Sequence, residues 1–161
     1  CNRINCYNPL TNETLKKMAD DIPEVTKNIL PDQELDCVAY GCTSGTIASG
    51  YQSIFEKVNI AKPNTKVTTP ITSVINALKL LKINKVSIFT PYTDEINRSV
   101  INYFKNEKVE IHELSYFDIA SDLEKKIGKI VLSSNQTLIW DTLKQINYNN
   151  KVEGYGELFN I

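Results

Sequence analysis

The chain has 161 residues, 42% of them hydrophobic and 23% charged, which is the length and composition of one ordinary globular domain. Its net charge of -1 gives no electrostatic reason to bind nucleic acid or a membrane surface, and its only arginines, Arg3 and Arg98, are too few for a nucleotide clamp of guanidinium groups. No stretch approaches the roughly 20 apolar residues of a membrane helix, and no signal-peptide pattern occurs, so we expect a cytoplasmic protein without nucleic-acid or membrane partners.

The four cysteines form two pairs with the same spacing, Cys1 with Cys6 and Cys37 with Cys42. Residues five apart on a strand point to opposite faces and lie about 16 Å apart, too far to share one tetrahedral zinc ion. A reducing compartment argues against disulfides. We therefore expect no metal site, and we interpret Cys37 as a small buried hydrophobic residue.

Strand and helix patterns alternate along the chain. Thr11 caps the first expected helix, which bends near Pro23, and Thr69 caps the helix that begins at Pro70. The apolar stripes of the later helices place Ile101 and Ile139 in the core. The expected strands are residues 1–6, 35–40, 66–69, 86–89, 109–114 and 129–132, and the helical patterns that follow them include 44–57 and 118–127.

This alternation predicts an α/β fold class. The expected architecture is a doubly wound, mostly parallel sheet with helices on both faces, in a single domain over residues 1–161. His112 lies on a strand pattern with no triad partners nearby, and we interpret it as non-catalytic. Trp140 is interpreted as part of the core.

The strand at 35–40 ends at a hydroxyl-rich turn that carries Cys42. Open α/β sheets bind ligands at the carboxyl ends of their strands. Free N–H groups at a helix N-terminus favour a thiolate and attract carboxylates. The sequence therefore predicts that Cys42 is a nucleophile beside a site for a carboxylate.

Four expected strand-to-helix turns share short side chains that donate hydrogen bonds. They comprise residues 42–46, 68–70, 90–93 and 133–135. Parallel strands would bring the turns to one edge of the sheet, where their Thr, Ser, Asn and Tyr side chains could surround a small carboxylate. The alternative is that each hydroxyl only caps its helix. No Gly-x-Gly-x-x-Gly or Walker pattern occurs, so a nucleotide cofactor is not expected.

The motifs resemble those of the maleate cis-trans isomerase and arylmalonate decarboxylase family, within the aspartate/glutamate racemase superfamily. The matching segments are 40–46, 68–70, 90–97, 133–136 with Trp140, and 154–159. The resemblance implies a racemase-like fold and chemistry without cofactors on a small carboxylic acid. It implies a catalytic role for Cys42 and substrate binding by Thr43, Ser44, Tyr92 and Asn135. Decarboxylases of the family usually have glycine at the position of Cys42, which favours the isomerase branch.

Two parts of the family pattern are missing, so the racemase-like fold is expected to be incomplete. An N-terminal strand should precede Cys1, and a second-half segment with another cysteine should lie near Ser121 and Asp122. Either the protein is a degenerate remnant, or the sequence is part of a longer chain. As it stands, we expect a gap near 121–122 and a groove beside Cys42 that is open on one side.

The leading functional hypothesis is isomerisation of a maleate-like diacid. The Cys42 thiolate would add to the double bond, allow rotation and then be eliminated. One alternative is a racemase or decarboxylase, which needs a second acid or base facing Cys42. The other is a carboxylate-binding remnant without turnover. The expected partners are a small carboxylate substrate and a second copy in a homodimer.

Overall fold

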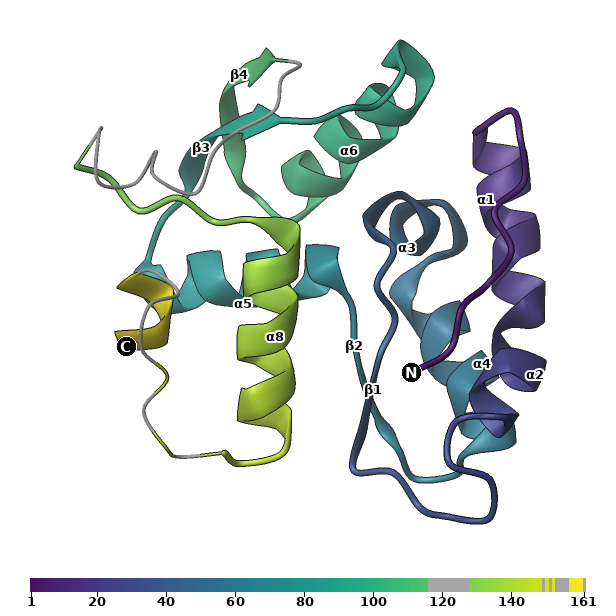
Figure 1. The fold of residues 1–161 in the computed structure, drawn as a ribbon. Helices are drawn as coiled ribbons and strands as arrows, with labels where there is room; N and C mark the ends of the chain where they lie inside the picture. Colours follow the sequence, from purple (N-terminus) through teal and green to yellow (C-terminus); the bar gives the residue numbers. More distant parts are fainter. Residues whose placement is uncertain (116–127, 149, 151, 153–156, 161) are drawn as a thin grey trace.

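The computed structural model describes residues 1–115, 128–148, 150, 152 and 157–160, along which helices and strands alternate (Figure 1). Its elements are α1 (Asn12–Met18), the 3-10 helix η1 (Ala19–Asp21), α2 (Ile22–Lys27), β1 (Cys37–Ala39), α3 (Thr43–Ser49), α4 (Tyr51–Ala61), β2 (Lys66–Thr68), α5 (Pro70–Leu81), β3 (Lys85–Phe89), α6 (Asp94–Asn106), β4 (Glu110–Ser115), α8 (Ser134–Gln145) and η2 (Glu157–Asn160). None of the helices in these ranges has the length and hydrophobicity that crossing a bilayer requires.

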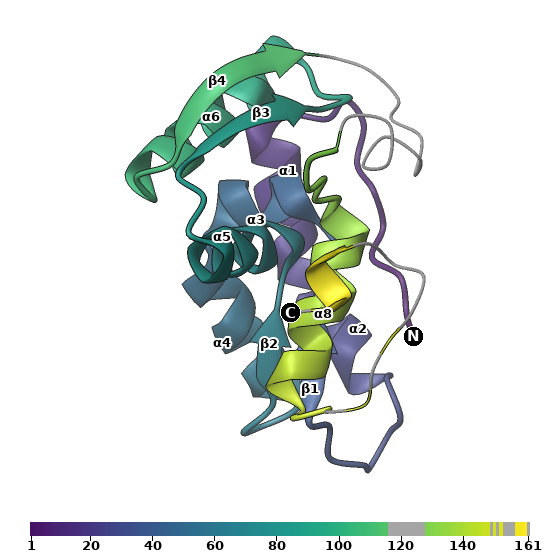
Figure 2. The ribbon, with the colours of Figure 1, turned by 90° about the vertical axis from the view of Figure 1, so that its left-hand side faces the viewer.

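The described strands pair in parallel, which confirms the α/β class. β1 lies beside β2 with Val38 opposite Val67, and β3 lies beside β4 with Lys85 opposite Glu110. The strands form two two-stranded sheets. Figures 1 and 2 show α8 on one side of the β1–β2 pair and α4 on the other, with β3, β4 and α6 together above them.

Helix stripes and strand side chains form the core where these elements meet. Ile54 and Val58 of α4 pack against the β1–β2 pair, in one cluster with Tyr40. A second cluster joins α5 to α6 and the start of β4; its buried members are Ile71, Ile75, Leu78, Val100, Phe104 and Val109. Burying such apolar stripes contributes about 25 cal/mol per Å² of apolar surface removed from water and holds the helices on the strands.

Local sequence chemistry sets several helix ends as predicted. The side chains of Thr11 and Thr69 accept hydrogen bonds at the starts of α1 and α5, each within a capping box, and Pro70 is the first residue of α5. The first predicted helix is divided by η1 into α1 and α2, with Pro23 in the first turn of α2. The helix predicted over 44–57 divides at Gly50, whose φ of 80° favours glycine and ends the first segment.

Two predicted strands are wrong. Residues 1–6 form no strand, because most of their side chains are exposed and no strand lies beside them; the Asn2 side chain donates instead to the carbonyl of Val25 in α2. Residues 129–132 also form no strand with any part of the chain that the structure describes, and Ile130 is exposed. An apolar alternation alone does not make a strand when no ladder of backbone hydrogen bonds is available.

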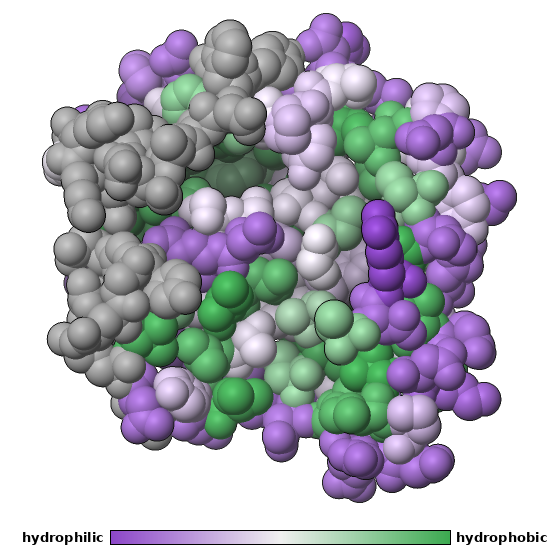
Figure 3. All heavy atoms as spheres, in the orientation of Figure 1, coloured by the Kyte–Doolittle hydropathy of each residue, from purple (hydrophilic) through white to green (hydrophobic). Residues whose placement is uncertain are grey.

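Two residues placed in the core by their helical stripes are exposed. Ile101 of α6 is 38% exposed and Ile139 of α8 is 51% exposed. α8 buries the face that carries Thr137, Trp140 and Asp141, so Ile139 points away from the strands. Figure 3 shows hydrophobic side chains along the outward face of α8. The predicted burial of Trp140 is confirmed.

The helix expected over 118–127, the gap expected near 121–122 and the motif residues 154–156 lie outside the described residues. The missing second-half segment and the single domain over 1–161 therefore stay predictions.

Candidate active site

Cys42 occupies the first turn after β1 and caps α3 with its sulfur. The Cys42 backbone N–H donates to the Tyr40 carbonyl at 2.9 Å, which turns the chain away from the strand direction. The Cys42 Sγ accepts a hydrogen bond from the Gly45 N–H at 3.2 Å, in the position that a Ser or Thr hydroxyl usually takes. The Thr46 hydroxyl donates to the Cys42 carbonyl at 2.7 Å, so the backbone on both sides of the thiol is fixed.

Hydroxyl groups from two turns lie beside this sulfur. Ser44 is buried, with its Oγ 3.9 Å from Cys42 Sγ. Burial raises the pKa of the Tyr92 phenol, while hydrogen bonds with the Ser44 and Thr43 side chains lower it by a smaller amount. Tyr92 is therefore protonated at neutral pH and can donate a hydrogen bond. The structure brings Cys42, Thr43, Ser44 and Tyr92 together.

A small hydrogen-bond network holds the turn that carries Tyr92. The Thr90 hydroxyl donates to Asn97 Oδ1 at 2.6 Å, and Asn97 Nδ2 donates to the Tyr92 carbonyl at 3.0 Å. Thr90 and Asn97 are both buried. The Thr90 hydroxyl, expected to face a ligand like the others of this turn, bonds within the protein, and the role of Asn97 was not predicted. The sequence did contain a sign of this role: Asn97 lies in the first turn of α6, from where its amide can reach back to the preceding loop.

The fourth turn reaches the site through Ser134. The Thr43 hydroxyl donates to Ser134 Oγ at 3.4 Å, and Ser133 caps α8. Both α3 and α8 begin at the upper end of the β1–β2 pair in Figure 1. Asn135, the predicted substrate ligand, is exposed in the first turn of α8. Ser134 thus joins this turn to the Cys42 turn, and substrate binding by Asn135 stays a prediction.

The second turn is structural, in keeping with the capping alternative. Thr69 caps α5, and the Thr68 hydroxyl donates to the Asp141 carboxylate. Ser73 Oγ lies 3.2 Å from the same carboxylate oxygen, and Asn76 Nδ2 donates to the other at 3.2 Å. This network joins β2, α5 and α8, and the Thr68 and Thr69 hydroxyls take part in hydrogen bonds within the protein.

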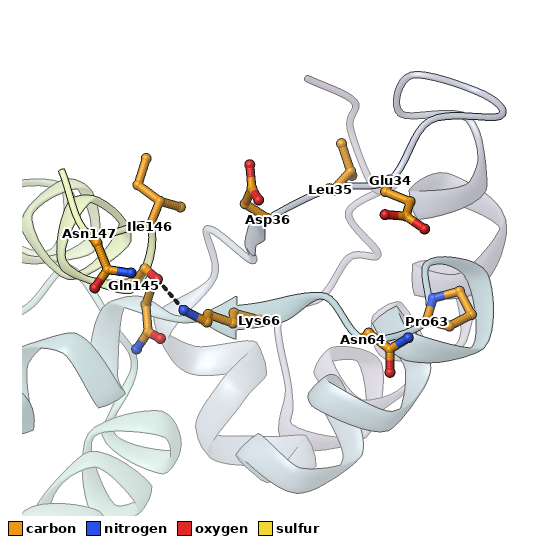
Figure 4. A pocket seen from close by; sticks show the side chains of 9 residues that line it. All are labelled: Glu34, Leu35, Asp36, Pro63, Asn64, Lys66, Gln145, Ile146 and Asn147. Carbon is orange, nitrogen blue, oxygen red and sulfur yellow. Dashed lines mark hydrogen bonds between the residues drawn. The ribbon is translucent and has the colours of Figure 1, made fainter.

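A cavity of about 300 Å³ lies at the opposite end of the β1–β2 pair. Figure 4 shows it between the amino ends of the strands and the end of α8, where Lys66 Nζ donates to the Gln145 carbonyl at 2.5 Å. Its lining residues are Glu34, Leu35, Asp36, Pro63, Asn64, Lys66, Gln145, Ile146 and Asn147. Parallel α/β sheets bind ligands at the carboxyl ends of strands, so this cavity is separate from the candidate site.

Cys37 differs from Cys42 in its surroundings. Burial, with a contribution from the Asp141 charge, raises the pKa of the half-buried Cys37 thiol to about 11. Its thiol is thus protonated at neutral pH. Cys1 and Cys6 are exposed. In the described residues, no three His, Cys, Asp or Glu side chains gather in positions that could hold a metal ion.

Comparison with known proteins gives a coherent set of relatives. The chain is 28% identical over 128 residues to the maleate isomerase of Alcaligenes faecalis, covering 74% of this chain and 48% of that protein. A Nocardia farcinica maleate cis-trans isomerase mutant matches in structure with a TM-score of 0.80 at 16% identity, covering 98% of this chain and 83% of the other. Arylmalonate decarboxylase matches with a TM-score of 0.74 at 18% identity, covering 94% and 84%. No family model matches the sequence.

The fold is the Asp/Glu racemase-like fold of maleate isomerases and arylmalonate decarboxylases, and the resemblance predicted from the motifs is confirmed. The sequence relative within this group is a maleate isomerase, an enzyme. The chain spans about half the length of that curated relative.

Proposed function

We propose that this chain carries out the cofactor-independent cis-trans isomerisation of a small, maleate-like dicarboxylic acid with Cys42 as the nucleophile. The observation that carries the proposal is the cluster of one thiol and three hydroxyls from Cys42, Thr43, Ser44 and Tyr92 at the carboxyl end of β1. A carboxylate needs several hydrogen-bond donors, and an alkene conjugated to it is open to attack by a thiolate.

The reaction balances without a cofactor. The Cys42 thiolate forms a C–S bond to one alkene carbon, and the electron pair of the double bond moves onto the other carbon and its carboxylate. The bond between the two carbons is then single and can rotate. The electron pair re-forms the double bond in the trans arrangement while the C–S bond breaks, so that the thiolate is regenerated and no net proton is consumed.

The hydroxyls act on the charge that this step creates. When the thiolate adds, negative charge grows on the carboxylate next to the carbanion. Thr43, Ser44 and Tyr92 donate hydrogen bonds to that carboxylate and are already held in place by α3 and by the Thr90–Asn97 network. Donors fixed before the reaction stabilise the developing charge without reorganisation.

The comparisons support the same chemistry. The Nocardia farcinica isomerase structure contains a covalently bound succinylcysteine intermediate, which is an adduct between a cysteine sulfur and a four-carbon diacid. By analogy, the sulfur of Cys42 would form a C–S bond to one alkene carbon of its substrate. A homodimeric assembly and a cytoplasmic location belong to the same proposal and rest on the resemblance and on composition.

Proton NMR in D2O tests the reaction class. The purified full-length protein is incubated with maleate, and the expected result is fumarate without deuterium at carbon, because addition and elimination exchange no C–H proton. Deuterium incorporation at the α-carbon of a tested carboxylic acid, or release of CO2 from a malonate, would point to the racemase or decarboxylase class. Binding of dicarboxylates without conversion would leave only a carboxylate-binding protein and contradict the proposal.

A further inference from the structure

Tyr40 places a buried hydroxyl without a partner next to the candidate nucleophile. Its side chain is 7% exposed and packs in the core cluster of the β1–β2 pair. Its hydroxyl makes no hydrogen bond with the described residues. Because an unsatisfied buried hydroxyl lowers stability, such a group in a folded protein calls for a physical reason.

The position of Gly45 shows where this hydroxyl points. A Cβ on residue 45 would lie 2.7 Å from Tyr40 Oη and 2.8 Å from Cys42 Sγ, closer than real Cβ contacts allow. Both atoms therefore converge on the space that the missing side chain leaves free. The Gly45 N–H already donates to the same sulfur at 3.2 Å. Glycine at this place is what permits the phenol, the thiol and the helix backbone to meet.

The proton of this phenol stays on its oxygen. Burial raises the pKa of Tyr40 well above its ordinary value, and the nearby Cys42 adds to that shift. Tyr40 is therefore a donor and never a base near neutral pH. A neutral thiol is a weak acceptor, whereas a thiolate accepts a strong, charge-assisted hydrogen bond.

We propose that Tyr40 is a positioning residue for Cys42, whose hydroxyl donates a hydrogen bond to the sulfur when the thiol has lost its proton to solvent. The hydroxyl has no partner of full hydrogen-bond geometry among the described residues, and the Cys42 side chain is the acceptor close to it. Together with the Gly45 N–H it gives the sulfur two donors. In the addition and elimination sequence proposed above, the thiolate is both nucleophile and leaving group, so a donor that favours it assists the departure step.

The contact can be measured without any substrate. The rate of Cys42 alkylation by neutral iodoacetamide is followed by peptide mass spectrometry across a range of pH. In Tyr40→Phe, we expect the pH of half-maximal rate to rise by about one unit, as loss of one hydrogen bond to a charged acceptor implies. Thermal stability is expected to stay equal or to increase, because the variant removes an unpaired buried hydroxyl.

Tyr51→Phe is the matched control. Tyr51 lies in the same part of the core, but its hydroxyl donates to the Val67 carbonyl at 3.0 Å. The dependence of the Cys42 alkylation rate on pH should not change in this variant. An unchanged profile in Tyr40→Phe, or an equal shift in both variants, would overturn the proposal.

Gly45→Ala provides a second, independent variant. Its Cβ forces Tyr40 Oη and Cys42 Sγ apart, so the Cys42 profile should shift in the same direction as in Tyr40→Phe. If Tyr40→Phe does not fold, this variant decides: no shift in Gly45→Ala would reject the role of Tyr40. The hydrogen bond from Tyr40 to Cys42 does not depend on the proposed function; only its effect on the rate of isomerisation does. A shifted profile in a protein that does not isomerise maleate would reject that function and retain the contact.

Discussion

Cys42 and Cys37 are close in sequence but lie in different surroundings. The Cys42 sulfur lies at the start of α3 and accepts the Gly45 N–H, whereas Cys37 lies on β1 with its pKa raised to about 11 by burial. We expect iodoacetamide to modify Cys42 before Cys37 at pH 7, and Cys37 to gain reactivity only as the pH approaches 11. Peptide mass spectrometry of partly labelled protein measures both rates at once. Faster labelling of Cys37 at neutral pH would contradict the placement of the thiols.

Tyr92 is expected to be a direct ligand of the substrate carboxylate. Tyr92→Phe keeps the ring, which packs against the hydrophobic residues of α1 and α5, and removes only the hydroxyl beside Ser44 and Thr43. Loss of one donor to a charged acceptor should weaken dicarboxylate binding by about 1–3 kcal/mol, measured by calorimetry. Tyr103→Phe, on the remote part of α6, should bind normally. Equal affinity in Tyr92→Phe would remove this residue from the site.

At the scale of elements, the turn between β3 and α6 depends on a single amide. Asn97→Ala removes the hydrogen bonds to Thr90 and to the Tyr92 carbonyl, leaving the buried Thr90 hydroxyl without the acceptor of its proton. We expect a loss of about 1–3 kcal/mol in the free energy of unfolding and weaker dicarboxylate binding, measured by urea titration and calorimetry. Asn102→Ala, exposed on the same helix, is the control. A stable Asn97→Ala variant with unchanged binding would show that the network does not position Tyr92.

Sequence patterns predicted those elements whose determinants are local. Thr11 and the Thr69–Pro70 pair mark helix starts because capping needs only neighbouring residues. The pattern at residues 1–6 was misleading, because a strand also needs a partner strand that the sequence cannot show. Gly50 ends α3 with a positive φ. Glycine can adopt this conformation but does not have to, so the sequence alone did not predict the break.

The candidate site was predictable in part. The thiol and its two neighbours in the turn follow from one short motif. Their proximity to Tyr92 was expected from a single parallel sheet, whereas β1 and β3 lie in separate two-stranded sheets. The isolated Tyr40 hydroxyl could not be foreseen, since it depends on how closely α3 folds back over Gly45. Asn135 was expected in the site from the family motif; the structure shows Ser134 of the same turn bonded to Thr43, and substrate binding by Asn135 stays a prediction.

At the scale of the whole molecule, Asp141 joins parts that are far apart in the sequence. Its buried carboxylate is held by Thr68, Ser73 and Asn76, so it ties α8 to β2 and α5. Asp141→Ala leaves the buried Thr68 hydroxyl without its carboxylate acceptor and removes the link to Ser73 and Asn76, so we expect a loss of about 2–4 kcal/mol in the free energy of urea-induced unfolding.

Asp20→Ala is the matched control for this prediction. Asp20 pairs with Lys57 at the surface, where the aspartate side chain is 71% exposed, so the loss should stay below about 1 kcal/mol. Equal losses of unfolding free energy in the two variants would mean that the Asp141 network does not stabilise the packing of α8 on β2 and α5.

The central claim for the molecule is that one thiol at the end of β1 performs the chemistry. Its most direct test is the rate of maleate isomerisation by the full-length Cys42→Ser protein, with Cys37→Ser as the matched variant five residues away on β1. We expect Cys42→Ser to lose roughly a thousandfold or more of the wild-type kcat, as removal of a nucleophile does, while Cys37→Ser keeps its activity. Activity in Cys42→Ser within tenfold of the wild type would contradict the claim.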